Sequence, residues 1–369
     1  MPNQNTLATA KKNQSDEFYT RFEDINKELN AYLEYNPDTF RNKTVLLPCD
    51  DPEWSNFTRY FAQNFEKLGL KKLISTSFAV ESKPSGAVYQ PTIFEMSDVQ
   101  YDEVKTRKQG KIFTLTRRNK RVDINDLKWK YLDGDGDFRS EEVKNLRDEA
   151  DIIVTNPPFS LFREFLSWII DAKKQFLIIG NINCLTYKEV FPLIKENKAW
   201  IGNGMGRWIS GFIVPENYEL YGTEARVEDG KRIVATNNCL WLTNLEHGRR
   251  HQPLQLMTME DNLKFSKHKE IREQGYPKYD NYDAIEVKYT DAIPSDYEGI
   301  MGVPITFLDK YSPEQFEIVD GRDVALGERQ RNKNTMLVKD ADSSINGKPT
   351  YARILIRRKA GNMEEGNQQ

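Results

Sequence analysis

The 369-residue sequence has only three cysteines, Cys49, Cys184 and Cys239, and they lie far apart. A small, odd number of scattered cysteines argues against a disulfide framework or a zinc cluster, and it favours a reducing compartment. Histidine is as scarce. His247 and His251 have the spacing of two ligands on a helix, but no carboxylate-rich motif accompanies them. We therefore expect no bound metal.

Long apolar runs are also missing. No window approaches the roughly 18 uninterrupted apolar residues of a membrane span. The polar start, MPNQNTLATAKKNQSDE, has no apolar centre of a signal peptide. These absences predict a cytoplasmic protein without a membrane partner. Hydrophobic residues still make up 38% of the chain, which is enough for a sizeable core in one large domain or two.

The chain also lacks an excess of positive charge, because its net charge is −3. Two segments are nevertheless basic. Residues 103–130 hold ten Lys or Arg against three Asp or Glu, and residues 328–359 hold nine against three. Such segments suit contacts with backbone phosphates, although solvated surface loops would look the same. The candidates in the first segment are Arg117, Arg118, Lys120 and Arg121.

Apolar periodicity predicts an alternation of strands and helices. We expect strands at 43–47, 72–78, 151–155, 175–181, 199–202 and 238–243, and helices at 22–35, 56–68, 140–149, 160–172 and 186–196. Short joints between strand, helix and strand predict right-handed parallel units. The fold class is therefore α/β, a doubly wound, mostly parallel sheet of Rossmann-like type.

Composition also suggests how the chain is divided. Residues 1–14 look disordered, 15–245 form the α/β domain, and about 80–131 form an insertion with some strand character. From 246 to 369 the sequence becomes rich in charge, tyrosine and proline, which suggests a loosely built second region.

The most informative stretch is the apolar run Asp151–Thr155 followed by Asn156-Pro157-Pro158-Phe159. It predicts a buried strand that ends in a rigid loop, because proline restricts both itself and the residue before it. The Asn156 amide oxygen and the Pro157 carbonyl could each accept an N–H of a ring-conjugated amine, and Phe159 offers a flat face to a planar base. The alternative is that Asn156 only caps the next helix, with Pro157 as its first residue.

Two acidic loops accompany this motif. Asp50 and Asp51 follow the first predicted strand, where open α/β sheets place polar groups for a ligand. Alternating aspartates at 133–137 resemble a calcium loop, but Phe138 replaces the glycine at the sixth position and Lys144 the carboxylate at the twelfth. We therefore do not assign a calcium site.

Several ordered motifs together resemble a known family, the S-adenosylmethionine-dependent, adenine-specific DNA methyltransferases of the EcoRI modification type. The resemblance runs from about residue 15 to 250. It is carried by SDEFYT (15–20), CDDP (49–52), LKKLISTS (70–77), GDGDFRS (134–140), TNPPFSLFRE (155–164), IIGN (178–181) and WLTNLEHGRR (241–250).

The resemblance implies a role for individual residues. Asn156 and Pro157 would accept the exocyclic amine of adenine, and Phe159 would stack on the base. The cofactor S-adenosylmethionine would be bound by Phe18, Tyr19, Thr20, Asp50, Asp51, Asp137 and Phe138. The glycine-rich loop common among methyltransferases is absent, and Ser75-Thr76-Ser77 stands where an acid usually binds the ribose. Ribose recognition is therefore unassigned, with Asp51 and Glu53 as candidates.

The expected reaction is methyl transfer to the N6 amine of a flipped adenine in a specific sequence of double-stranded DNA. Alternatives are methylation of RNA or of a protein glutamine, and an inactive DNA-binding relative. Residues 246–369 are expected to recognise the target, with Arg249 and Arg250 at guanine or phosphate unless they form a helix-end charge pair. A restriction endonuclease that acts on the same sequence is a candidate partner.

Overall fold

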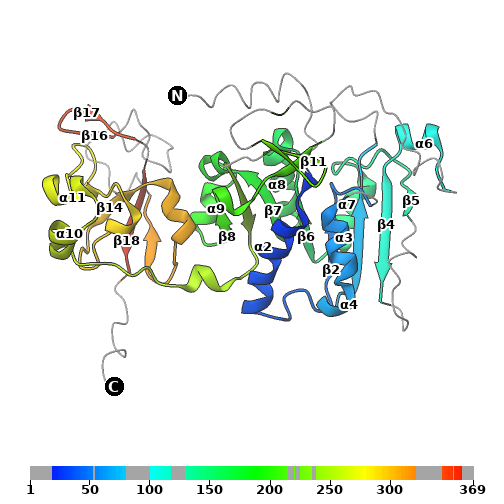
Figure 1. Ribbon diagram of the computed structural model, residues 1–369, viewed down its shortest axis with the longest axis horizontal. Helices are drawn as coiled ribbons and strands as arrows, with labels where there is room; N and C mark the ends of the chain where they lie inside the picture. The colour runs from blue at the N-terminus through cyan, green and yellow to red at the C-terminus, as the bar shows by residue number, and fades with distance from the viewer. Residues whose placement is uncertain are drawn as a thin grey trace. The chain divides into compact units, whose positions relative to one another are not determined.

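The computed structural model describes residues 19–52, 55–79, 100–117, 129–214, 220, 225–234, 238–320, 343–351 and 353–359 (Figure 1). The predicted disordered tail, residues 1–14, lies outside these ranges. The chain divides into two compact units. Unit 1 comprises Met1–Ile182 and Ile201–Glu246, and unit 2 comprises Asn183–Trp200 and His247–Gln369.

An eight-stranded sheet dominates unit 1. Its strand order is β5-β4-β3-β2-β6-β7-β12-β8. The strands are β2 (Thr44–Leu47), β3 (Lys72–Thr76), β4 (Lys111–Thr116), β5 (Trp129–Tyr131), β6 (Ile152–Thr155), β7 (Gln175–Asn181), β8 (Trp200–Met205) and β12 (Cys239–Thr243). All six strands predicted from the sequence are present.

The sheet is mixed, whereas a mostly parallel sheet was predicted. Strands β3, β2, β6 and β7 form a parallel centre. Strand β4 runs antiparallel to β3, β5 antiparallel to β4, and β12 antiparallel to β7. The predicted insertion thus contributes β4 and β5 to the main sheet, where β4 pairs with the backbone groups at the edge of β3.

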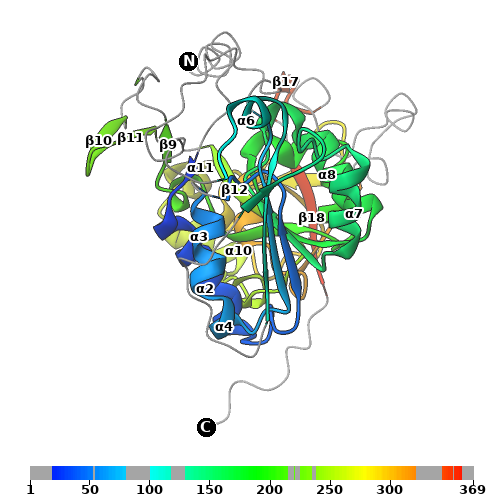
Figure 2. The same ribbon diagram turned by 90° about the vertical axis from the view of Figure 1, so that its right-hand side faces the viewer.

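Helices cover both faces of this sheet (Figure 2). On one face lie α2 (Phe22–Tyr35), α3 (Asn56–Gln63) and α4 (Phe65–Leu68), and on the other lie α7 (Glu141–Glu149) and α8 (Phe162–Asp171). Local chemistry sets their ends. The Ser55 hydroxyl accepts the Phe57 N–H and caps α3, and Gly69 ends α4 at a φ of 64°.

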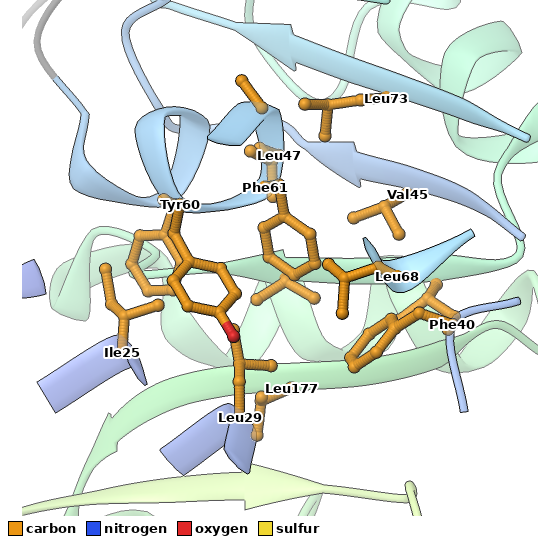
Figure 3. Close-up of a cluster of buried hydrophobic side chains, with 14 of the residues drawn as sticks. Ile25, Leu29, Phe40, Val45, Leu47, Tyr60, Phe61, Leu68, Leu73 and Leu177 are labelled. Carbon is orange, nitrogen blue, oxygen red and sulfur yellow. The ribbon is translucent and has the colours of Figure 1, made fainter. Parts of the chain in front are cut away.

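The core of unit 1 fills the space between the sheet and helices α2 to α4 (Figure 3). Ile25 and Leu29 of α2 meet Phe61 of α3 and Val45 of β2, and all four are fully buried. Burying such a side chain contributes about 1.5–3 kcal/mol. This packing holds the central strands, and with them the loops at their ends, in place.

A smaller antiparallel sheet in unit 1 was not predicted. Its order is β1-β9-β11-β10, with β1 at Tyr19–Thr20, β9 at Phe212–Val214, β10 at Arg226–Glu228 and β11 at Lys231–Val234. Asp229 and Gly230, both at positive φ, form the turn of the β10–β11 hairpin. Strand β1 has two residues, too short for a periodic signal.

The remaining described elements of unit 1 and its boundary are short. They are α6 (Glu103–Lys108), the 3-10 turns η3 (Phe159–Leu161) and η5 (Gly206–Trp208), and η4 (Ile182–Thr186). The helix predicted at 186–196 is only α9 (Phe191–Lys195), in unit 2, with Pro192 in its first turn.

Unit 2 has its own four-stranded sheet, β13-β14-β18-β15. Its buried centre includes Met301, Val303, Phe316 and Ile356, all with no exposed surface, so unit 2 is better packed than its sequence suggested. The elements are α10 (Met259–Phe265), α11 (Lys269–Gln274), β13 (Ala284–Glu286), β14 (Ile300–Val303), β15 (Phe316–Ile318), β16 (Ser344–Ile345), β17 (Lys348–Pro349), β18 (Ile354–Arg358), and the 3-10 turns η6 (Gly248–His251), η7 (Thr290–Ala292) and η8 (Ile305–Lys310).

Within the described ranges, no helix has both the length and the apolar character to cross a bilayer.

Candidate active site

The candidate site lies at the carboxyl edge of the parallel strands. Strands β2, β3 and β6 run in the same direction, so the segments that follow them emerge at one edge. Asp50 follows β2, Ser77 follows β3, and Asn156 follows β6. Ligands of open α/β sheets bind at this edge.

Asp50 links three of these elements from inside the protein. The residue is only 5% exposed. Its Oδ1 accepts a hydrogen bond of 2.6 Å from the Ser55 hydroxyl, and its Oδ2 accepts one of 2.7 Å from the Thr155 hydroxyl. The Ser75 hydroxyl donates to the Asp50 backbone carbonyl at 2.6 Å. The loop after β2 is therefore joined to α3, β3 and β6.

The electrostatics of this loop follow from its burial. Burial raises the pKa of the Asp50 carboxyl from 3.8 to about 7, against the lowering effect of the bonds from Ser55 and Thr155, and the charge of Asp51 raises it further. Burial, and then the Asp50 charge, raise the pKa of the Cys49 thiol well above its ordinary value. Cys49 is therefore a neutral thiol and no nucleophile.

Asn156 and Pro157 form the loop that leaves β6. Pro157 is buried, Asn156 is half-buried, and the Asn156 Oδ1 atom is itself buried. The 3-10 turn η3 starts after Pro158 and α8 starts after Leu161, and no side chain caps either start. The interpretation of Asn156 as a helix cap is therefore wrong, because the helix begins too far along the chain.

Phe159 connects this loop to the small sheet. Its half-buried ring lies 6.5 Å from the ring of Phe212, with an angle of 79° between the planes. Phe212 is paired with Thr20 across β9 and β1. Directly opposed residues of antiparallel strands point to the same face. Thr20 and Phe212 thus share a face, and Phe159 adjoins it.

Among the predicted cofactor residues of this segment, Thr20 is the most distinctive. It is 3% exposed, and within the described residues its Oγ1 has no hydrogen-bond partner. A buried hydroxyl without a partner is what a bound polar ligand would satisfy. Tyr19 is half-buried and pairs with Ile213 on the other face, and Phe18 lies outside the described residues.

The acidic loop before α7 lies at the end of β3. The Ala79 N–H donates to the Asp135 carbonyl at 2.7 Å. Gly136 has a φ of 82°, and a Cβ there would lie 2.2 Å from the Ser77 carbonyl oxygen. Only glycine permits this approach. The close approach brings the loop to the same edge as Asp50 and Asn156.

Asp137 and Phe138 differ in their surroundings. Hydrogen bonds from the Arg139 guanidinium lower the pKa of Asp137, which is half-buried. Phe138 is 5% exposed, and its ring lies 5.1 Å from that of Phe165. Phe138 therefore packs against α8.

The predicted DNA-binding residues belong to both units of the chain. Arg117 is exposed after β4, while Arg118, Lys120 and Arg121 fall outside the described residues. In unit 2, Arg249 forms an ion pair of 2.6 Å with Asp309 and is 30% exposed. Arg250 is 7% exposed and lies over the Trp200 ring at 3.6 Å. The geometry favours a structural part for Arg250.

Sequence reasoning missed two contributors. Thr155 was noticed only as part of the motif, although its hydroxyl is fully buried against Asp50. Phe212 was not noticed, because a lone aromatic in a short strand carries no periodic signal. Ser55 precedes the helix expected at 56–68, and its bond to Asp50 has no sequence signature.

The family model for the adenine-specific methyltransferase EcoRI matches residues 6–359. The chain belongs to this family. A curated relative, Type II methyltransferase M.EcoRI of Escherichia coli, is 48% identical over 96% of both chains. This EcoRI-type enzyme is therefore an adenine-specific DNA methyltransferase, as the motifs predicted.

Two mycoplasma proteins are also similar to this EcoRI-type methyltransferase. Type II methyltransferase M.MpnI of Mycoplasma pneumoniae and M.MgeORF184P of Mycoplasma genitalium are each 34% identical, over 95% of this chain and 97% of theirs. No solved structure matches the chain. Family membership implies a methyl donor and excludes a protein glutamine as the principal substrate.

Proposed function

We propose that this enzyme transfers the methyl group of S-adenosylmethionine to the N6 amine of an adenine flipped out of a specific duplex DNA sequence. The observation that supports it most is the gathering of Asn156, Pro157 and Phe159 after β6, beside the loop of Asp50. Flipping is required because the amine cannot reach a cofactor from inside the base stack.

Asn156 and Pro157 act on the amine. The Asn156 Oδ1 and the Pro157 carbonyl oxygen each accept one N–H, which draws the nitrogen lone pair away from the ring as the nitrogen becomes tetrahedral. The bound cofactor supplies an activated methyl group on a sulfonium. Catalysis by the protein is then positioning together with polarisation of the amine.

Phe159 holds the base. Its ring is half-buried and supported by Phe212, so one face can remain available to a planar ligand. Stacking of a base on an aromatic ring contributes about 1–3 kcal/mol. The support from Phe212 limits the orientations of Phe159 before the base arrives.

The residues present fit S-adenosylmethionine at the same edge. The buried Thr20 Oγ1 can satisfy a polar group of the cofactor. Tyr19, Asp51 and Asp137, which are half-buried, remain candidates for direct contact, as do the buried Asp50 and Phe138. The parallel centre of the eight-stranded sheet and the position of these residues at its carboxyl edge support a Rossmann-like methyltransferase fold.

The two basic segments support a nucleic acid over a protein as the substrate, and the intact Asn156, Pro157 and Phe159 argue against an inactive relative. The chain around Arg117 would follow backbone phosphates, and residues 246–369 would read the target, with Arg249 better placed than Arg250. The relatives are named Type II methyltransferases. A cognate restriction endonuclease is therefore the candidate partner, and the cytoplasm the expected location.

The test is expression in a host that lacks adenine methylation, followed by mapping of modified adenines across its genome. One recurrent motif that carries N6-methyladenine is expected. An Asn156→Ala protein made at the same level is the matched control and should leave the genome unmodified. Unmodified DNA with the wild-type protein, or methylation found only in RNA, would contradict the proposal.

A further inference from the structure

Thr155 attaches the catalytic loop, which we define as residues 156–159, to the rest of the site. It is the last residue of β6 and directly precedes Asn156. Its side chain has no exposed surface, and its hydroxyl donates to Asp50 Oδ2 at 2.7 Å. The orientation of the peptide that leads into Asn156 is thus tied to the position of the Asp50 carboxylate.

The Asp50 carboxylate is held from the opposite side by α3. The Ser55 hydroxyl donates to Asp50 Oδ1 at 2.6 Å while it accepts the Phe57 N–H at 3.1 Å as the cap of α3. Ser55 is therefore oriented by the helix and not by solvent. A helix start and a strand end are joined through one carboxylate.

The Asp50 backbone is fixed as well. Its N–H donates to the Thr76 carbonyl at 3.0 Å, and its carbonyl accepts from the Ser75 hydroxyl at 2.6 Å. The Ser75 and Thr58 hydroxyls lie 2.7 Å apart, which links β3 to α3. With main chain and side chain both held, Asp50 has little freedom to turn toward a ligand.

We propose that Asp50 is a positioning residue, which acts through Thr155 to hold Asn156 in the geometry that accepts the adenine amine. This inference rests on the proposed function of Asn156. It reassigns Asp50 from a direct contact with the cofactor to a support of the catalytic loop, and it leaves Asp51 as the carboxylate of that loop for the cofactor.

The charge state of Asp50 matters for this role. Both of its oxygens accept hydrogen bonds from hydroxyls, which is the pattern of an ionised carboxylate. The groups around it are the Cys49 thiol, the acid Asp51, and the hydroxyls of Ser55, Ser75 and Thr155. No cation among the described residues balances its charge. Uptake of a proton would turn one acceptor into a donor and displace a hydroxyl.

The first test removes the Thr155 hydroxyl with little change of shape. Thr155→Val should slow single-turnover methylation of a duplex that carries the mapped sequence by at least about tenfold, since small displacements of reacting groups cost this much or more. The affinity for S-adenosylmethionine alone should be unchanged. Thr155→Ser, which restores the hydroxyl, should recover most of the rate.

Thr243→Val is the matched control for loss of a buried threonine hydroxyl. Thr243, at the end of β12, donates to the Phe176 carbonyl at 2.6 Å and has no exposed surface. This variant should be less stable but should keep the single-turnover rate. A Thr155→Val enzyme as fast as the wild type would overturn the proposal.

The second test follows the rate with pH. Single-turnover methylation by the wild type should rise as pH increases through about 7, where the Asp50 carboxyl ionises. Asp50→Asn should be slower and lose this transition, with its affinity for S-adenosylmethionine preserved. Weakened cofactor binding at an unchanged rate would instead make Asp50 a cofactor contact and would overturn the proposal.

Two outcomes separate this inference from the proposed function. If Asn156→Ala is inactive while Thr155→Val and Asp50→Asn are fully active, only the positioning role fails. If Asn156→Ala itself is fully active, the role of Asn156 fails and the positioning role with it; if the wild-type protein leaves duplex DNA unmodified, the proposed function fails. Should Thr155→Val not fold, the pH profiles of the wild type and Asp50→Asn decide the question.

Discussion

Each of the two units buries a carboxylate, and the two carboxylates differ in the groups that donate hydrogen bonds to them. In unit 1, Asp50 is 5% exposed and accepts hydrogen bonds only from hydroxyls in the described contacts of its side chain. In unit 2, Glu286 is 2% exposed and accepts from the Arg353 guanidinium at 2.6 and 2.9 Å and from the Tyr279 hydroxyl. One carboxylate has neutral partners, and the other has a cation.

The difference shows what each carboxylate is suited to. A buried ion pair holds two segments together in one register, and its loss leaves an uncompensated charge. A buried carboxylate with neutral partners can gain or lose its proton near neutral pH, as the raised pKa of Asp50 indicates. The first arrangement suits the framework of unit 2, and the second suits a loop that takes part in chemistry.

The largest effect is expected from breaking the ion pair of unit 2. Arg353→Met keeps most of the side-chain volume but leaves Glu286 buried without a cation, so it should destabilise the protein by about 3–5 kcal/mol. Denaturant unfolding measures this. Arg357→Met is the matched control, since the Arg357–Glu317 pair is 50% and 39% exposed and should contribute at most about 1 kcal/mol. Equal losses for both variants would contradict the distinction.

The next effect is catalytic and belongs to the loop beside Asp50. Asn156→Ala should lower single-turnover methylation by about 100- to 1000-fold, because one positioned polar group is lost from a water-excluded site. Cofactor affinity should stay within a few fold, and so should DNA binding. Thermal unfolding measured beside the rate checks the alternative. A destabilised variant with full turnover per folded molecule would exclude the catalytic role.

The protonation of Asp50 should appear in the pH dependence of stability. Its folded pKa, about 7, lies above the ordinary value of 3.8, so the folded protein binds the proton more tightly than the unfolded chain. The stabilisation is present below about pH 4 and is lost as pH rises to about 7. Relative to Asp50→Asn, the wild type should lose about 1.4 kcal/mol per pH unit at most in this window. A difference that does not vary with pH would show that Asp50 is not buried as described.

Phe159 and Phe138 are expected to differ, the first as a binding surface for the base and the second as part of the packed core. Phe159→Ala should weaken binding of a duplex with a destabilised target base pair by about 1–3 kcal/mol, since a stacking surface is lost. Phe138→Ala removes a ring that packs on α8 and should instead lower the free energy of unfolding by about 3–5 kcal/mol. Binding and unfolding measurements on both variants distinguish the two. Loss of stability but not of binding in Phe159→Ala would place Phe159 in the framework.

The smallest effect is expected at an exposed charge. Arg117 lies in water after β4, so its pairing with a phosphate is screened. Arg117→Ala should reduce the slope of log affinity for DNA against log salt by about 0.9 if one phosphate contact is lost. Arg117→Lys keeps the charge and should keep the slope. An unchanged slope in the alanine variant would return Arg117 to the solvated surface.

Much of the fold was readable because its signals are local. The apolar run before Asn156 forms β6 where the sequence analysis expected a strand, and the helix expected at 56–68 is present as α3 and α4. Other features depend on strand pairing between distant segments. Strand β4 joins the sheet beside β3, and the two-residue β1 exists only because β9 is there to pair with it. No local pattern announces such a partner.

The amino-acid pattern alone predicts the succession of strands and helices along the chain of unit 1, the Asn-Pro-Pro-Phe loop and the family. Three features are visible in the folded structure alone: Asp50 turns inward, Arg250 is buried over Trp200, and Asn156 lies clear of the helix start. The reason is physical. Periodicity and turn chemistry act between near neighbours in the chain, whereas burial, and with it the pKa of Asp50, is set by Thr155, which the chain brings back from 105 residues away.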